Sequence, residues 1–124
     1  MIAWHELRER VNADAEFRLA ARLWEATLRL DIGETSHRLR FEDGSLAAVE
    51  PCGGEAACDL FVGASEDDWR ELLAPVPRPY YQDLLGARLL HGIRLPEDPL
   101  AYAAYYPALR RLVQLLSASR EEGR

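Results

Sequence analysis

The feature that most constrains the fold is a change of hydrophobic period at Ser65. Before Ser65, apolar and polar residues alternate through several segments, and this period of two predicts strands. After it, apolar residues recur at spacings of three and four, which predicts helices. The strands and helices are therefore largely segregated along the chain, and we predict an α+β fold with one sheet built from the first half. A length of 124 residues predicts a single domain over 1–124.

The first half is expected to begin with a short amphipathic helix over residues 4–14, where Trp4, Leu7 and Val11 share one face. Turns at Gly33-Glu34, Asp43-Gly44 and Gly53-Gly54 then separate runs of alternating apolar residues. These runs predict four strands in an antiparallel meander, over 24–32, 35–42, 46–50 and 56–63.

The segment from Phe17 to Leu23 has two interpretations. Its apolar residues alternate with arginines, but the parity of the alternation changes between Leu23 and Trp24. If the segment is a strand, this change requires a β-bulge. If it is helical, a helix-to-strand boundary lies at the same place.

The second half is expected to consist mainly of helices. Ser65 precedes Asp68 by three residues and predicts a capped helix over 66–74. A proline-rich connection follows, and Asp98 and Pro99 mark the start of a long last helix. Pro107 should kink that helix or split it. The remaining elements are a helix over 80–88, a short fifth strand over 89–95, and the last helix over 99–119.

Composition excludes several classes of function. Twenty-one acidic residues against fifteen basic ones give a net charge of −6, which disfavours nucleic-acid binding. All fifteen basic residues are arginine, so lysine Schiff-base chemistry and a phosphate-loop lysine are excluded. The sequence shows neither a leader peptide nor a membrane span, and we expect a cytoplasmic protein. Cys52 and Cys58 match no zinc or redox spacing and are expected to be free thiols.

The order of these elements resembles the sterol carrier protein type-2 family of lipid-binding domains. The segments that carry the resemblance are 26–33 (ATLRLDIG), 39–46 (LRFEDGSL) and 64–73 (ASEDDWRELL). The resemblance implies a curved, mainly antiparallel five-stranded sheet covered by helices. It also implies an apolar tunnel between them for a sterol, a fatty acyl chain or a polycyclic or terpenoid-like ligand.

The second half carries more bulky apolar and aromatic side chains than one face of a small sheet needs. A solid core and a ligand cavity are both compatible with this excess. Tyrosine hydroxyls are costly to bury without partners, whereas a cavity that holds a partly polar ligand or water satisfies them. Together with the resemblance, this predicts a tunnel lined by Trp69, Tyr81, Leu84, Tyr102, Tyr106 and Leu109.

No catalytic constellation is evident in the sequence. His91 and Asp83 are the two candidates for acid or base chemistry, because both lie near the expected cavity. The three histidines have no partner at helical spacing, so no metal site is expected. Gly53-Gly54 does not open a helix, and no nucleotide or other cofactor is expected.

Three functions follow from these observations. The first is a small, bacterial-type carrier that binds a hydrophobic molecule, with transient membrane contact and homodimer formation as further options. The second is a cofactor-independent isomerase, cyclase or hydrolase acting on a polyketide- or steroid-like substrate in the same cavity. The third is a non-catalytic interaction subunit with a solid core. A convergent acid and base facing the ligand would favour the enzyme.

Overall fold

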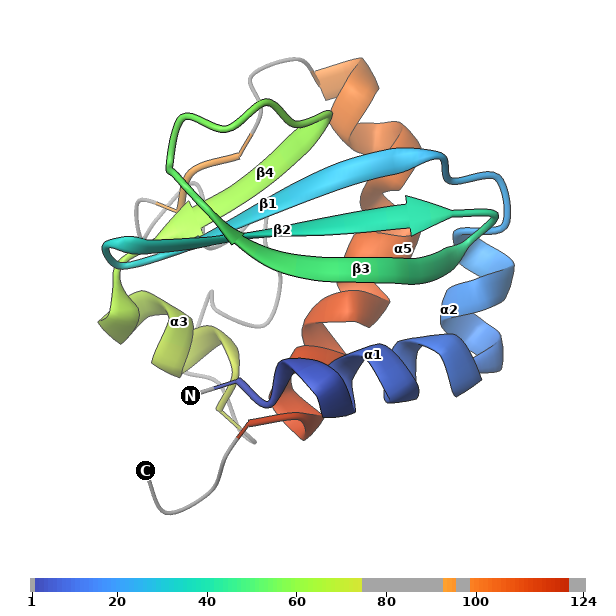
Figure 1. Cartoon of the computed structure of the whole chain (residues 1–124), viewed down its shortest axis with the longest axis horizontal. Coiled ribbons are helices and arrows are strands. Elements are labelled where there is room, and N and C mark those ends of the chain that lie inside the picture. The colour runs from blue at the N-terminus through green and yellow to red at the C-terminus, as the bar shows by residue number, and fades with distance from the viewer. Residues whose placement is uncertain (1, 75–92, 96–98, 121–124) are drawn as a thin grey trace.

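The computed structural model describes residues 2–74, 93–95 and 99–120, and the side chains of 99–102 lie outside this description. Figure 1 shows a twisted sheet with helices packed along it. The elements, labelled as in that figure, are α1 (Trp4–Ala13), α2 (Ala15–Ala20), β1 (Ala26–Ile32), β2 (Thr35–Glu42), β3 (Ser45–Cys52), β4 (Leu60–Ala64), α3 (Glu66–Leu72) and α5 (Pro99–Ala118).

The sheet has the strand order β3-β2-β1-β4. β1 pairs with β2 and β2 with β3 in antiparallel register, as the hairpin signals predicted. The prediction that residues 56–63 continue the antiparallel meander is wrong, because β4 begins at Leu60 and runs parallel to β1. Residues 53–59 carry the chain from β3 at one edge across to the opposite edge (Figure 1), so a tight hairpin is not formed.

Two local predictions about turns and caps are confirmed. Asp43 and Gly44 both have positive φ, 52° and 73°, as a two-residue hairpin turn requires. The hydroxyl of Ser65 accepts a hydrogen bond from the backbone N–H of Asp68 at 3.1 Å and caps α3.

The segment at residues 17–23 follows the helical interpretation. α2 covers residues 15–20, and its N-cap Asp14 accepts a hydrogen bond from the backbone N–H of Phe17 at 2.7 Å. Phe17 and Ala21 are fully buried, whereas Leu19 and Leu23 are 66% and 85% exposed. Residues four apart therefore share the buried face, as in a helix, and no strand or bulge forms here.

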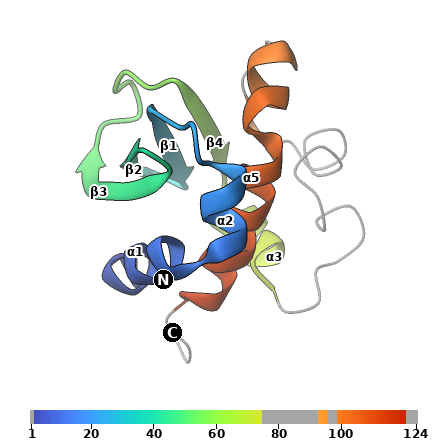
Figure 2. The same cartoon turned by 90° about the vertical axis from the view of Figure 1, so that its right-hand side faces the viewer.

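The core lies between one face of the sheet and the helices. In β1, the side chains of Leu28, Leu30 and Ile32 are buried, since alternate residues of a strand face the same side. Figure 2 shows α1, α2 and α5 together on this side of the sheet. α5 contacts both α1 and α2, and this packing closes the core.

α5 passes through Pro107 as one helix, so of the two alternatives expected there, a kink or a split, the split does not occur. The proline removes one backbone hydrogen bond, but it lies on the exposed side of the helix. The residues that follow it on the other side are buried, and their packing outweighs the missing bond: Ala108, Leu109, Leu112, Leu115 and Leu116.

The α+β class is confirmed. The described part of the chain forms a mixed sheet of four strands instead of the expected five, and two of its three strand pairings are antiparallel. Of the expected fifth strand at 89–95, only 93–95 are described, and they make one bridge. There Arg94 pairs with Gly63 through two backbone hydrogen bonds of 2.9 and 2.7 Å. The expected helix at 80–88 and the cap at Asp98 lie outside the described residues. None of the helices described is long and apolar enough to cross a membrane.

Candidate functional site

Three of the six predicted tunnel residues converge on the core between the sheet and α5. Trp69 on α3 is 2% exposed and Leu109 on α5 is 1% exposed, and both belong to the same apolar cluster. Tyr106, one residue before Pro107, is half-buried and packs against that cluster. The structure thus brings α3 and α5 to one apolar region.

The other predicted site residues cannot be placed in this way. Tyr102 lies within α5, but its side chain is outside the described part of the structure. Tyr81, Leu84 and the two acid-base candidates, Asp83 and His91, belong to the segment 75–92, which is also outside it.

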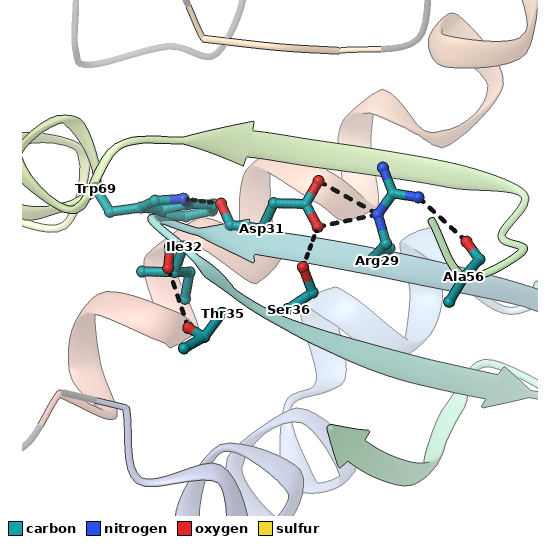
Figure 3. A network of polar contacts seen from close by, with 7 residues as sticks. All are labelled: Arg29, Asp31, Ile32, Thr35, Ser36, Ala56 and Trp69. Atoms are coloured by element: carbon teal, nitrogen blue, oxygen red, sulfur yellow. Dashed lines mark hydrogen bonds and ion pairs between the residues drawn. The ribbon is translucent and has the colours of Figure 1, made fainter. Parts of the chain in front are cut away.

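Trp69 is held in one orientation by a buried hydrogen bond. Its indole N–H donates to the backbone carbonyl of Asp31 at 2.8 Å, which ties α3 to β1 (Figure 3). A buried indole N–H needs such an acceptor. Tyr105, which lies on α5 beside Tyr106, packs edge-on against Trp24 with ring centroids 5.1 Å apart. Aromatic side chains near both ends of β1 are therefore fixed by specific contacts.

The opposite face of the sheet carries a polar cluster that the sequence analysis missed. Arg29 and Asp31 alternate with the core residues of β1 and point away from the helices. Figure 3 shows their contacts: Nε of Arg29 donates to both carboxylate oxygens of Asp31, at 2.9 and 3.2 Å. The hydroxyl of Ser36, from the neighbouring position on β2, donates to the same carboxylate at 2.7 Å. The alternation of charged and apolar residues along β1 is the sequence pattern from which this polar cluster could have been predicted.

The cluster is covered by the crossing segment 53–59. Nη1 of Arg29 donates to the carbonyl of Ala56 at 3.1 Å, and the guanidinium lies 5.1 Å from the ring centroid of Phe61. The side chains of Arg29 and Asp31 are consequently only 14% and 10% exposed. Burial is the largest influence on the pKa of Arg29 and lowers it, but the hydrogen bond to Asp31 and the negative charge of Asp31 together outweigh burial, and the net shift is upward. The Arg29 guanidinium therefore stays charged at any physiological pH.

An open pocket of about 410 Å³ lies beside this cluster on the outer face. Arg29, Asp31, Ser36 and Phe61 line it from the strands. Its other described lining residues are Gly33, Glu34, Gly54 and Arg94.

The cysteines and histidines of the described segments form no shared site. Cys52 and Cys58 are free and half-buried, and burial raises the pKa of the Cys58 thiol. His5 pairs with Glu9 at 3.2 Å on the exposed side of α1. His37 lies on β2 and stacks on Trp4. Within the described ranges, no group of three or more His, Cys, Asp or Glu residues is arranged to hold a metal ion.

No protein-family model and no curated protein matches the sequence, but solved structures do. A crystal structure of sterol carrier protein 2 aligns with a TM-score of 0.77 and 23% identity, covering 97% of this chain and 98% of its own. A Thermus thermophilus protein described as possibly a sterol carrier protein aligns at 0.73 and 23%, covering 98% and 90%. A ubiquinone synthesis protein named UbiJ-SCP2 aligns at 0.53 and 18%, covering 90% and 89%. Over nearly its whole length, this chain therefore has a fold similar to that of sterol carrier protein 2.

Proposed function

We propose that this domain binds a hydrophobic small molecule in an apolar tunnel between the sheet and the helices. The ligand classes are a sterol, a fatty acyl chain, or a polycyclic or terpenoid-like molecule. The similarity of fold supports this proposal, since two of the similar structures are named for sterol carriers and the third for the synthesis of ubiquinone. The proposed lining residues are Trp69, Tyr81, Leu84, Tyr102, Tyr106 and Leu109.

The observation that carries the proposal is the convergence of Trp69, Tyr106 and Leu109 on one apolar cluster. Trp69 and Leu109 come from different helices and supply large buried surfaces. Tyr106 remains half-buried at the edge of the cluster, where its ring has an apolar body and a polar end. Such a combination suits a ligand that is mainly hydrophobic and carries a few polar groups.

The affinity would come mainly from burial of apolar surface. At about 25 cal/mol per Å², burial of about 300 Å² of ligand surface contributes about 7 kcal/mol. Loss of translational and rotational freedom opposes this gain. We therefore expect dissociation constants in the micromolar range, and salt should have little effect on them.

The proposal is tested by titrating a fluorescent fatty acid or sterol analogue into wild type and into Leu84→Arg and Tyr106→Ala. Leu84→Arg places a charge in the proposed tunnel and should abolish saturable binding, while Tyr106→Ala should weaken it. The matched control is Leu19→Arg, because Leu19 is 66% exposed on α2. It makes the same chemical change outside the tunnel and should bind like wild type.

Circular dichroism confirms that each variant is folded before its binding is compared. Absence of saturable binding to wild type would contradict the proposal. Equal binding by wild type and folded Leu84→Arg would contradict it as well, because a buried arginine is incompatible with an apolar lining.

A further inference from the structure

Arg94 lines the outer-face pocket and has no ion-pair partner among the residues that the structure describes. Its backbone is fixed by the two hydrogen bonds to Gly63, and its guanidinium lies directly above that glycine. A Cβ at position 63 would lie 2.7 Å from Nη2 and 2.9 Å from Nε of Arg94, so any larger residue there would force the guanidinium to move from this position. Across the described segments, no carboxylate forms an ion pair or side-chain hydrogen bond with it. The described part of the chain thus holds a guanidinium at a defined place without an acidic partner for it.

Arg29 supplies a second guanidinium to the same pocket. Its Nε and Nη1 are used by Asp31 and Ala56, while Nη2 has no hydrogen-bond partner among the residues described. Asp31 is already paired with Arg29 and accepts a hydrogen bond from Ser36, so its charge is compensated. The remaining acid of the pocket, Glu34, is exposed and is free to turn into solvent. Among the described lining residues, the uncompensated charge inside the pocket is therefore positive.

The pocket also offers an apolar surface and sufficient room. Phe61 is half-buried beside Arg29, and about 410 Å³ is within the range of small-molecule sites. We propose that this pocket binds a small organic anion, with the guanidinium groups of Arg94 and Arg29 holding its carboxylate or phosphate and Phe61 contacting its body. Guanidinium groups bind both kinds of anion through charge-assisted hydrogen bonds. The site lies on the face of the sheet opposite to α5 and does not depend on the proposed hydrophobic ligand.

The probes for the test share a phenyl ring and differ in charge: benzoate, phenyl phosphate and uncharged benzamide. Each is titrated into ¹⁵N-labelled protein while three amide resonances are followed: those of Gly33 and Gly54, which line the pocket, and that of Gly63, which pairs with Arg94. At least one anion should shift these resonances saturably, and whichever binds more tightly identifies the preferred group. Benzamide should bind about tenfold or more weakly, because it cannot form the charge-assisted hydrogen bonds.

Three variants locate the binding site. Arg94→Gln removes the charge and should weaken anion binding about tenfold or more. Gly63→Ala keeps the charge but displaces the guanidinium, and it should weaken binding to a similar extent. Arg38→Gln is the matched control, because Arg38 lies on the same face but is paired with Glu50 at 2.8 Å and does not line the pocket. This control should bind like wild type.

The proposal is overturned if neither anion shifts the three glycine resonances, or if benzamide binds as tightly as benzoate. Wild-type affinity in folded Arg94→Gln would also overturn it, as would an equal loss in Arg38→Gln. If Arg94→Gln fails to fold, Gly63→Ala and the comparison of benzoate with benzamide still decide the question.

Discussion

The ion pair between Asp14 and Arg111 joins residues 97 positions apart. We predict how much it contributes to the free energy of unfolding. Nε and Nη2 of Arg111 donate to the two carboxylate oxygens of Asp14 at 3.0 and 2.7 Å. The same carboxylate caps α2 through the backbone N–H of Phe17. One side chain therefore holds the start of α2 and docks it on α5.

The size of the effect follows from these two roles. Loss of an N-cap costs about 1 kcal/mol of unfolding free energy. Charge-assisted, two-point hydrogen bonds contribute about 1.5 to 3 kcal/mol, and the lower part of this range applies because Arg111 is 28% exposed. We therefore expect Asp14→Ala to destabilise the protein by about 2 to 3 kcal/mol. Asp14→Asn keeps a capping oxygen and should cost about 1 to 2 kcal/mol.

The pH dependence of this ion pair provides a second readout. The hydrogen bond from Arg111 lowers the pKa of Asp14 below 3.8. A carboxyl group whose pKa is lower in the folded state stabilises the protein above the unfolded pKa, and this contribution is lost as the pH falls through the folded pKa. The stability difference between wild type and Asp14→Asn should accordingly be present at neutral pH and shrink in acid.

Urea denaturation of wild type, Asp14→Ala, Arg111→Gln and the double variant measures the coupling directly. A coupling free energy of about 1 to 2 kcal/mol is expected at neutral pH. Additive effects of the two substitutions would refute the argument, as would an Asp14→Ala variant within about 0.5 kcal/mol of wild type.

Three further predictions concern other parts of the chain. Burial lowers the pKa of His37, so the unfolded state binds a proton more readily than the folded state does. Between about pH 7.5 and pH 5.5, the unfolding free energy from urea denaturation should therefore fall more for wild type than for His37→Phe. Gly44→Ala should lower the unfolding free energy, measured by thermal denaturation, by about 2 kcal/mol, because φ is 73° and a Cβ would lie 2.7 Å from a backbone oxygen. Gly53→Ala, with open space around it, should lower it by less than about 1 kcal/mol. Thiol titration of the unfolded, unreduced protein should count two free thiols, from Cys52 and Cys58; a count of zero would contradict their free state.

Elements defined by local sequence could be predicted well. α1, the β2–β3 hairpin and the capped helix α3 follow from apolar spacing, from Asp43-Gly44 and from Ser65, all of which act over a few residues. α2 was ambiguous because Phe17, Leu19 and Ala21 satisfy a period of two as well as part of a helical stripe. The docking of α2 on α5 decides in favour of the helix, because it buries Phe17 and Ala21 and leaves Leu19 exposed.

Features that depend on distant pairing could not be predicted. The sequence around Leu60 identifies a strand but not its partner, and the parallel pairing with β1 results from a crossing of the sheet. The outer-face pocket was missed for the same reason. Arg29 and Arg94 are 65 positions apart, and only the pairing of Gly63 with both Asp31 and Arg94 brings them together.

The central claim is that a hydrophobic ligand lies between the sheet and α5, and photo-crosslinking tests it most directly. Protein loaded with a diazirine-bearing palmitate is irradiated, digested with trypsin and mapped by mass spectrometry. Because every basic residue is arginine, cleavage after Arg94 and Arg110 releases one peptide, 95–110, that contains Tyr106 and Leu109. We predict label in this peptide that excess unlabelled palmitate displaces. Label that is absent from it, or that unlabelled palmitate does not displace, would contradict the claim.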